Sequence, residues 1–77
     1  MRSEVRMPNL GMDMETGKIA AWLKQVGDSV ERGEVIAEIE TDKATVDMEA
    51  LQSGTLVEIV AGVGAELPVG EVIAYIE

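Results

Sequence analysis

The residue with the clearest chemical potential in this chain is Lys43, which stands inside the run Glu40-Thr41-Asp42-Lys43-Ala44-Thr45. An unperturbed lysine amine has a pKa of about 10.4, so it is protonated near neutral pH and is no nucleophile. The neighbouring sequence offers no apolar burial that could lower the pKa of Lys43. A lysine in a turn usually serves only solubility. Its other use is as an accessible amine that a modifying enzyme can acylate.

Other catalytic chemistry is poorly supplied. The 77 residues include no cysteine and no histidine, which excludes disulfides, thiolate nucleophiles and the side chain that ordinarily titrates near neutrality. The formal net charge is −9, from 6 basic and 15 acidic side chains, and this sign repels phosphate backbones and anionic lipid headgroups. We therefore expect no nucleic-acid partner, no membrane partner, no metal site and no autonomous catalytic activity. The length fits one small domain, and the short apolar runs predict a soluble, intracellular protein.

Short β-prone runs separated by Gly, Pro, Asp and Ser predict an all-β fold. The predicted strands are Glu4 to Met7, Gly17 to Leu23, Val35 to Glu40, Ala44 to Glu49, Gly54 to Val60 and Val72 to Ile76. Apolar residues in the run 19–26 also have amphipathic helix spacing, but the related run 56–60 is β-branched, which favours strands for both. Residues 28–31 look like a helix capping box, yet Gly33 follows too soon for a helix, so we predict a turn there.

Alternation of apolar and polar residues sets a strand register around Lys43. A tight turn centred on residues 42–43 gives the pairs Ile39 with Val46, Ala37 with Met48, Val35 with Ala50, Glu40 with Thr45 and Glu38 with Asp47. The first three pairs share one face of the sheet and the last two share the other, and a shift by one residue would mix the faces. The pattern therefore places Lys43 at a hairpin tip. Because Asp-Lys is not an Asn-Gly type of sequence, a type I turn or a slightly wider loop is expected.

The chain also contains an internal repeat. The segments 17–40 and 54–77 are related by an offset of 37 (54 − 17), and nine of the fifteen pairs from Val26 with Val63 to Glu40 with Glu77 are identical. Two copies are too few for a solenoid. We predict one domain over residues 1–77, in which two similar halves are related by a pseudo-twofold axis and joined by the lysine-bearing hairpin 41–53.

The run around Lys43 is preceded by Gly27-Asp28-Ser29-Val30-Glu31-Arg32-Gly33-Glu34 and followed by Gly54. Together these residues closely resemble the lipoyl domains of 2-oxoacid dehydrogenase acyltransferase (E2) components, over about Met7 to Glu77. The resemblance implies a flattened β-barrel of two four-stranded antiparallel sheets with quasi-twofold symmetry, and lipoic acid in amide linkage to Lys43. It also implies a non-catalytic carrier that shuttles acyl groups and reducing equivalents among three enzymes: a thiamine-diphosphate decarboxylase (E1), the E2 acyltransferase core and dihydrolipoyl dehydrogenase (E3).

The same resemblance implies roles for three groups of residues. The first would let a lipoylating enzyme, either a ligase or an octanoyltransferase with lipoyl synthase, recognise the hairpin: Glu40, Asp42 and Ala44. The second is a loop near the tip that would help E1 select this domain: Met12, Asp13, Met14, Glu15 and Thr16. The simpler interpretation of the two methionines is core filling. The third group would serve turns: Gly27, Gly33 and Gly54.

Several alternatives stay open. A biotinyl carrier domain of a biotin-dependent carboxylase has the same fold and lysine, but methionine typically flanks that lysine, whereas Asp42 and Ala44 flank Lys43. The glycine-cleavage carrier protein is longer and has additional helices. An unmodified acidic interaction module would leave the run around Lys43 unexplained. With no catalytic domain or Ala/Pro-rich linker, the chain is expected to be an excised domain or a free-standing monomeric carrier. The absence of a targeting segment favours a bacterial cytoplasm, with the mitochondrial matrix as the eukaryotic alternative.

Overall fold

The computed structural model describes residues 2–9, 15–41 and 44–77. The strands are β1 (Ser3–Arg6), β2 (Thr16–Trp22), β3 (Ser29–Val30), β4 (Val35–Glu40), β5 (Thr45–Glu49), β6 (Gly54–Ile59), β7 (Glu66–Pro68) and β8 (Val72–Ile76). All six predicted strands are confirmed, with ends that differ by at most one residue from the predicted ones. Within these described ranges there is no helix long and apolar enough to cross a membrane.

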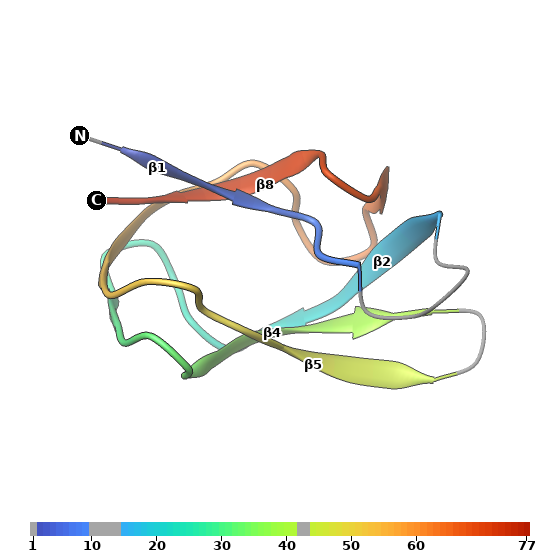
Figure 1. Cartoon of the computed structure of the whole chain (residues 1–77), viewed down its shortest axis with the longest axis horizontal. Helices are drawn as coiled ribbons and strands as arrows, with labels where there is room; N and C mark the ends of the chain where they lie inside the picture. Colours follow the sequence, from blue (N-terminus) through green and yellow to red (C-terminus); the bar gives the residue numbers. More distant parts are fainter. Residues whose placement is uncertain (1, 10–14, 42–43) are drawn as a thin grey trace.

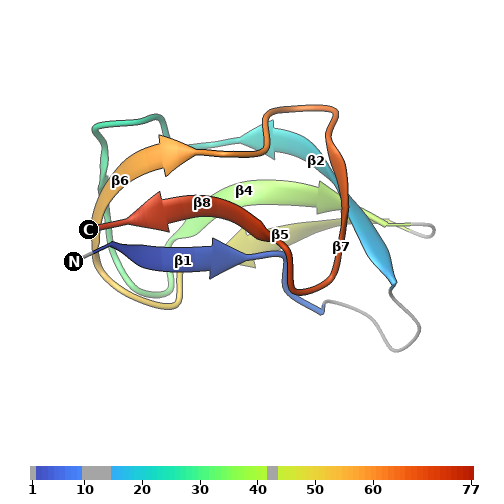
Figure 2. The same ribbon diagram turned by 90° about the horizontal axis from the view of Figure 1, so that it is seen from above.

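The strands form two antiparallel sheets. One sheet has the order β1-β8-β6-β3 and the other has the order β5-β4-β2-β7. Figure 1 shows the sheets stacked on each other, and Figure 2 shows the same arrangement from above. The predicted fold of two four-stranded antiparallel sheets is therefore confirmed.

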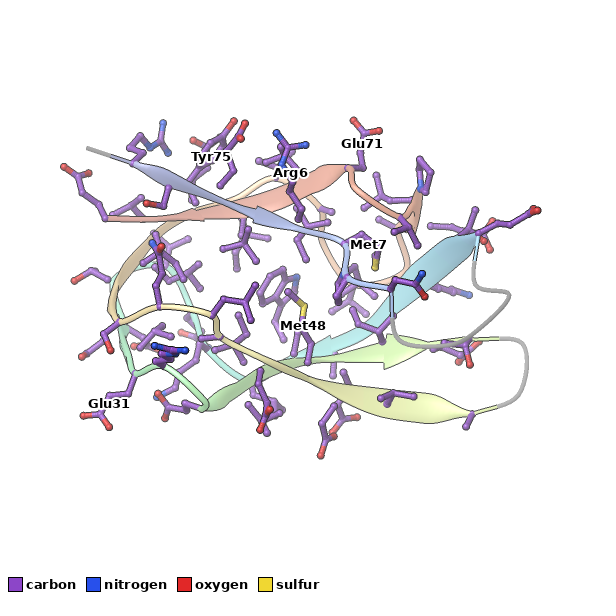
Figure 3. The ribbon with its side chains drawn as sticks, in the orientation of Figure 1. Arg6, Met7, Glu31, Met48, Glu71 and Tyr75 are labelled. Atoms are coloured by element: carbon purple, nitrogen blue, oxygen red, sulfur yellow. The ribbon has the colours of Figure 1, made fainter. Side chains whose placement is uncertain are left out.

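The core fills the space between the two sheets with aliphatic side chains. Its buried members are Met7, Ile19, Val30, Ile36, Ala37, Ile39, Met48, Ala50, Leu56, Ala61, Ile73, Ala74 and Ile76. In Figure 3 the side chains of Met7 and Met48 lie between the sheets. No charged or polar residue of the described ranges is buried, so burial of apolar surface is the main favourable contribution to folding.

The strand pairing repeats with the sequence. Ile19 pairs with Ile39 between β2 and β4, and Leu56 pairs with Ile76 between β6 and β8. Both members of the second pair lie 37 residues after those of the first (56 − 19 and 76 − 39). The backbone bonds of the turns repeat as well, since Gly27 N–H donates to Leu56 O at 2.7 Å and Gly64 N–H donates to Ile19 O at 2.8 Å.

The irregularities of the strands obey the same repeat. The register of β2 on β4 shifts at Ala20 and that of β6 on β8 shifts at Val57. Likewise, the register of β4 on β5 shifts at Ile36 and that of β8 on β1 shifts at Ile73. Each pair of shifts is 37 residues apart (57 − 20 and 73 − 36). Because bulges bend and twist a strand, this matching gives the two halves the same curvature.

Two short strands were not predicted. Residues 28–31 were predicted to form a turn, but Ser29 and Val30 form β3, which pairs with Thr55 and Gly54 of β6. Its counterpart β7 pairs with β2. Strands of two or three residues are too short to show an alternating pattern. Only the repeat of the sequence could have indicated that both halves contain such a strand.

The amphipathic helix alternative for residues 19–26 is not observed. Ile19 is fully buried in β2, but Leu23 and Val26 are 50% and 57% exposed. Both exposed residues belong to the turn that follows β2. The helical spacing was therefore coincidental, because only the first part of the run faces the core.

Candidate functional site

The candidate site is the hairpin that β4 and β5 form around Lys43. The structure pairs Glu40 with Thr45, Ile39 with Val46, Glu38 with Asp47 and Ala37 with Met48, as the alternation predicts. The fifth predicted pair is wrong. Val35 pairs with Glu49 and not with Ala50, because the register shift at Ile36 adds one residue to β4.

The base of the hairpin tip is closed by hydrogen bonds between Thr41 and Ala44. The Thr41 N–H donates to the Ala44 carbonyl oxygen at 2.8 Å, and the Thr41 hydroxyl also donates to that oxygen, at 2.9 Å. The Ala44 N–H lies 3.2 Å from Thr41 Oγ1 and donates to it. The side chain of Thr41 thus holds both strands of the hairpin where the ladder ends.

Asp42 and Lys43 lie outside the described residues, and their assigned roles stay predictions. What the structure describes is the scaffold on either side of them. Glu40, Ala44 and Thr45 are exposed, so the predicted recognition residues of the described part are accessible to a modifying enzyme.

The hairpin lies at one end of a molecule whose longest extent is 32 Å. Figure 1 places the N- and C-terminal ends side by side at the opposite end, and Figure 2 agrees. The pairing of Ser3 with Ile76 between β1 and β8 holds the terminal strands together there. Any chain joined to either end would therefore leave the molecule far from the hairpin.

The outer face of the hairpin is acidic. Glu38 lies directly opposite Asp47, and Glu40 pairs with Lys18 of β2 on its other side. The Glu38 and Asp47 pair is the like-charge contact that the register predicts, and such pairs are mildly destabilising. Within the described ranges none of these carboxylates forms an ion pair. The scaffold therefore presents negative charge beside the tip.

The predicted E1-recognition loop is described only in part, because Met12, Asp13 and Met14 lie outside the described residues. Glu15 and Thr16 are exposed at the start of β2. The Val69 N–H donates to the Glu15 carbonyl oxygen at 3.0 Å, which ties this segment to the end of β7. Since Lys18 pairs with Glu40, Glu15 and Thr16 lie toward the hairpin end of β2. Their recognition role stays a prediction.

The three predicted turn glycines divide into two kinds. Gly27 and Gly33 lie in turns with φ of 98° and 87°, a backbone conformation that costs other residues about 1–2 kcal/mol. Gly54 is not in a turn, because it is the first residue of β6. A Cβ there would lie 2.6 Å from Ile76 Cγ2 and 2.8 Å from the Glu77 carbonyl oxygen. Gly54 is needed for close approach of two strands, so its assignment to a turn was wrong.

One ion pair that the sequence did not reveal lies away from the hairpin. Lys24 Nζ is 2.9 Å from Glu34 Oε2. The hydrogen bond from Lys24 lowers the pKa of Glu34, and a second bond from the Glu31 N–H, 3.0 Å long, lowers it further. The same bond to Glu34 raises the pKa of Lys24. Both groups connect turns that follow β2 and β3, so this pair is structural.

Comparisons with known proteins give a consistent result. The model of the family described as "Biotin-requiring enzyme" matches residues 3–76. Component 2 of the dihydrolipoyllysine-residue acetyltransferase of the mitochondrial pyruvate dehydrogenase complex from Arabidopsis thaliana is 56% identical over 72 residues. That alignment covers 92% of this chain but 13% of the relative, so the chain spans only a small part of its relative's length.

The fold is shared with solved structures, among them a lipoyl domain and a carboxylase. The lipoyl domain of the 2-oxoglutarate dehydrogenase complex from Azotobacter vinelandii is 31% identical with a TM-score of 0.76, over 96% of this chain and 94% of that one. The Kluyveromyces lactis urea carboxylase is 25% identical with a TM-score of 0.81, over 100% of this chain and 6% of that one. Of these two structures, the lipoyl domain is the one that is covered over nearly its whole length.

Proposed function

This chain belongs to the biotin/lipoyl attachment family, and on that premise we propose that it is a lipoyl carrier domain of a 2-oxoacid dehydrogenase complex, with lipoic acid in amide linkage to Lys43. The proposal treats residues 1–77 as one non-catalytic domain that forms part of a dihydrolipoamide acyltransferase. The observation that carries it is the hairpin of β4 and β5. Its base is closed at Thr41 and Ala44, its flanks are exposed, and it lies at the end of the molecule opposite both termini.

The residues of the hairpin fit the attachment of such a group. An amide at Lys43 needs an amine that an enzyme can reach without unfolding the domain, and the hydrogen bonds between Thr41 and Ala44 keep the two strands of the hairpin joined. Acylation removes the charge of the amine and takes the formal net charge from −9 to −10. When attached, a lipoyl group supplies a dithiolane that carries acyl groups and electrons. The protein supplies the rigid support and the surface by which partners select it.

Tethering explains why a carrier is useful. A group fixed to a mobile domain meets each active site at a local concentration far above that of the free compound. The partners in this proposal are the lipoylating enzyme, E1, the E2 core and E3, in a bacterial cytoplasm or a mitochondrial matrix. Glu40, Asp42 and Ala44 serve recognition by the lipoylating enzyme. The loop 12–16 serves recognition by E1.

A biotinyl carrier domain is the second candidate. It is supported by the description of the matched family and by the urea carboxylase that shares the fold. The flanking residues favour the lipoyl proposal, because Asp42 and Ala44 stand where biotinyl domains typically have methionine.

Intact mass and peptide mapping test the proposal after expression in cells supplied with both lipoate and biotin. We expect a lipoyl adduct confined to Lys43 and its complete loss in Lys43→Arg. Lys18→Arg is the matched control, because Lys18 is exposed on the strand beside the hairpin and pairs with Glu40; it should keep the adduct. A biotinyl adduct would replace the lipoyl proposal by the second candidate, and the absence of any adduct would reject both.

A further inference from the structure

A surface groove runs between β1 and β5, which are one edge strand of each sheet. β1 and β5 are each the first strand of their sheet order. Figures 1 and 2 place both on the same side of the molecule, away from β2 and β6. The apolar lining of the groove includes Val5, Met48, Leu51 and Ile76, and its charged lining is Glu4, Arg6, Asp47 and Glu49.

Leu51 is the most exposed large apolar residue of the described ranges. It is 87% exposed, next to Ala50 at the end of the β5 segment, whereas Met48 and Ile76 of the same groove are 4% and 1% exposed. The groove therefore has a buried apolar floor and one apolar side chain that stands free at its end. An apolar side chain in that position gains free energy when a partner covers it.

The outer edge of β5 has backbone groups with which no described strand pairs. In an antiparallel ladder the residues that bond to the neighbouring strand alternate with residues that point the other way. At one end of β5, the Ala44 carbonyl oxygen accepts from the Thr41 N–H, so Ala44 bonds toward β4. At the other end Ala50 does the same, because its N–H donates to the Glu34 carbonyl oxygen and its carbonyl oxygen accepts from the Gly33 N–H. Thr45, Asp47 and Glu49 lie between the bonded positions of β5. Their N–H and C=O groups therefore point away from β4, where no described strand pairs with them.

The edges of β1 and β5 differ in charge. On β1, Arg6 forms an ion pair with Glu4 at 2.6 Å and donates to the Gly70 carbonyl oxygen at 2.7 Å. On β5, Asp47 and Glu49 are exposed and form no ion pair with any described residue. Both charged residues of the β5 edge are thus negative and lack a cationic partner among the described residues, while Glu4 and Arg6 of the β1 edge are paired with each other.

We propose that the outer edge of β5 binds an extended segment of a partner protein in which lysine or arginine alternates with apolar residues. The segment adds as a strand to the sheet, with its backbone bonded to Thr45, Asp47 and Glu49. Its cations lie opposite the two carboxylates on the outer face, because opposite charges stabilise cross-strand pairs. Its apolar residues enter the groove and cover Leu51. This mode of peptide recognition uses main-chain bonds for affinity and alternate side chains for specificity.

The interaction needs neither Lys43 nor a modification, so its test is independent of the proposed carrier function. The probe is a short blocked peptide that alternates lysine and valine, titrated into the isotope-labelled Lys43→Arg protein and followed by NMR. We expect the largest shift changes and new protection from hydrogen exchange at the amides of Thr45, Asp47 and Glu49. Two further peptides carry backbone N-methyl groups on one or the other alternate set of residues. Only one of the two should lose binding, because an added strand directs one set of amides toward β5.

Substitutions test the charge pairs and the apolar contact of the proposed complex separately. Asp47→Asn and Glu49→Gln should each weaken binding by roughly 1.5- to 5-fold, the size of a cross-strand charge pair. Leu51→Ser should weaken it roughly tenfold. Val63→Ser is the matched control, because Val63 is 67% exposed but does not line the groove; it should bind as the unsubstituted protein does.

Three results would overturn the proposal. Equal binding of both N-methylated peptides would show non-specific attraction to an acidic protein. Shift changes confined to β1 would assign the site to the other edge. Protection of the β5 amides that grows with protein concentration, without peptide, would show that a second copy of the chain covers the edge.

Discussion

The two ends of this molecule are built on the same strand pairing but are connected differently. At the hairpin end, Ile39 of β4 pairs with Val46 of β5, and a continuous chain joins the strands. At the opposite end, Ile76 of β8 pairs with Ser3 of β1, and the two strands belong to the two ends of the described chain. The repeat thus provides two equivalent scaffolds, of which one is closed by covalent bonds. The difference shows that two ends with the same strand pairing can differ in connectivity, since only one of them has strands joined by a hairpin.

The outer faces of the two sheets differ as well. In the sheet with the termini, Arg2 forms an ion pair with Glu58 and lies 4.5 Å from the centre of the Tyr75 ring. In Figure 3, Tyr75 and Arg6 lie on this outer surface. In the sheet of the hairpin, the residue equivalent to Tyr75 is Glu38 (75 − 38 = 37), and it lies opposite Asp47. Equal backbones therefore present a charge-compensated face on one side and an acidic face on the other.

Truncation of the two equivalent isoleucines sharpens the comparison of the ends most strongly. Ile39 is fully buried and Ile76 is 1% exposed, so either change to alanine removes three buried carbon atoms and should cost about 2–5 kcal/mol. We expect Ile39→Ala to be the more destabilising, because its neighbours are Ile19 and Val46, whereas those of Ile76 are Leu56 and Ser3.

Urea unfolding followed by circular dichroism measures both changes. Ile39→Val and Ile76→Val are the controls, since each removes a single methyl group and should cost about 0.5–1.5 kcal/mol. A larger loss for Ile76→Ala than for Ile39→Ala would mean that the end with the termini is the better packed one, contrary to this expectation.

The sequence was informative about the hairpin because one face of β4 and β5 is apolar. Alternation from Ala37 to Glu40 against Thr45 to Met48 leaves one register that keeps charges out of the core. It was not informative at the bulge, since Val35-Ile36-Ala37 is uniformly apolar and contains no polar residue to show which side chain leaves the core. The register beyond that point therefore could not be read from the pattern.

Contacts between segments that are distant in the sequence could not be predicted, for a similar reason. The ion pair of Arg2 with Glu58 and the close approach of Gly54 to Glu77 depend on which strands become neighbours. Local patterns do not contain that information. The resemblance implied the fold. It did not indicate that Glu4 and Arg6 of β1 form an ion pair, whereas Asp47 and Glu49 of β5 form none with a described residue. The candidate site differs, because Lys43 stands in a local run that can be recognised without any tertiary contact.

Trp22 and its counterpart Ile59 allow a second test, which asks whether the two halves contribute equally to stability at this position. Trp22 Nε1 donates to the Ala61 carbonyl oxygen at 2.8 Å, and Ile59 has no donor with which to make such a bond. Trp22→Phe keeps an aromatic ring but leaves the carbonyl of a buried residue without this partner. It should therefore cost about 1–3 kcal/mol. Ile59→Val, which removes one methyl group, should cost about 0.5–1.5 kcal/mol.

Both variants are compared by circular dichroism, because Trp22 is the single tryptophan and its fluorescence is lost in one of them. If Trp22→Phe proves no more costly than Ile59→Val, the bond to Ala61 adds nothing measurable. Packing alone would then stabilise both halves at these positions.

The smallest expected effect concerns Glu34 and Glu71, which are equivalent in the repeat (71 − 34 = 37) but differ in their partners. Lys24 holds the pKa of Glu34 below its ordinary value, whereas Ala61 occupies the position equivalent to Lys24 (61 − 24 = 37). A carboxyl whose pKa is lower in the folded state stabilises the fold above its unfolded pKa, and that contribution disappears as the pH falls through the folded pKa. The raised pKa of Lys24 adds stability that disappears only in strong alkali, above its ordinary value of 10.5.

Glu34→Gln should therefore lower the urea midpoint slightly at neutral pH and not at all in acid, where Glu34 is protonated in both states. Glu71→Gln is the control, and it should leave the midpoint nearly unchanged at both pH values because Glu71 has no lysine partner in the described ranges. Equal effects of the two substitutions at neutral pH would show that the exposed pair contributes nothing beyond the loss of one charge, as many surface ion pairs do. The asymmetry of the halves would then be confined to their core, to their outer faces and to the open edges.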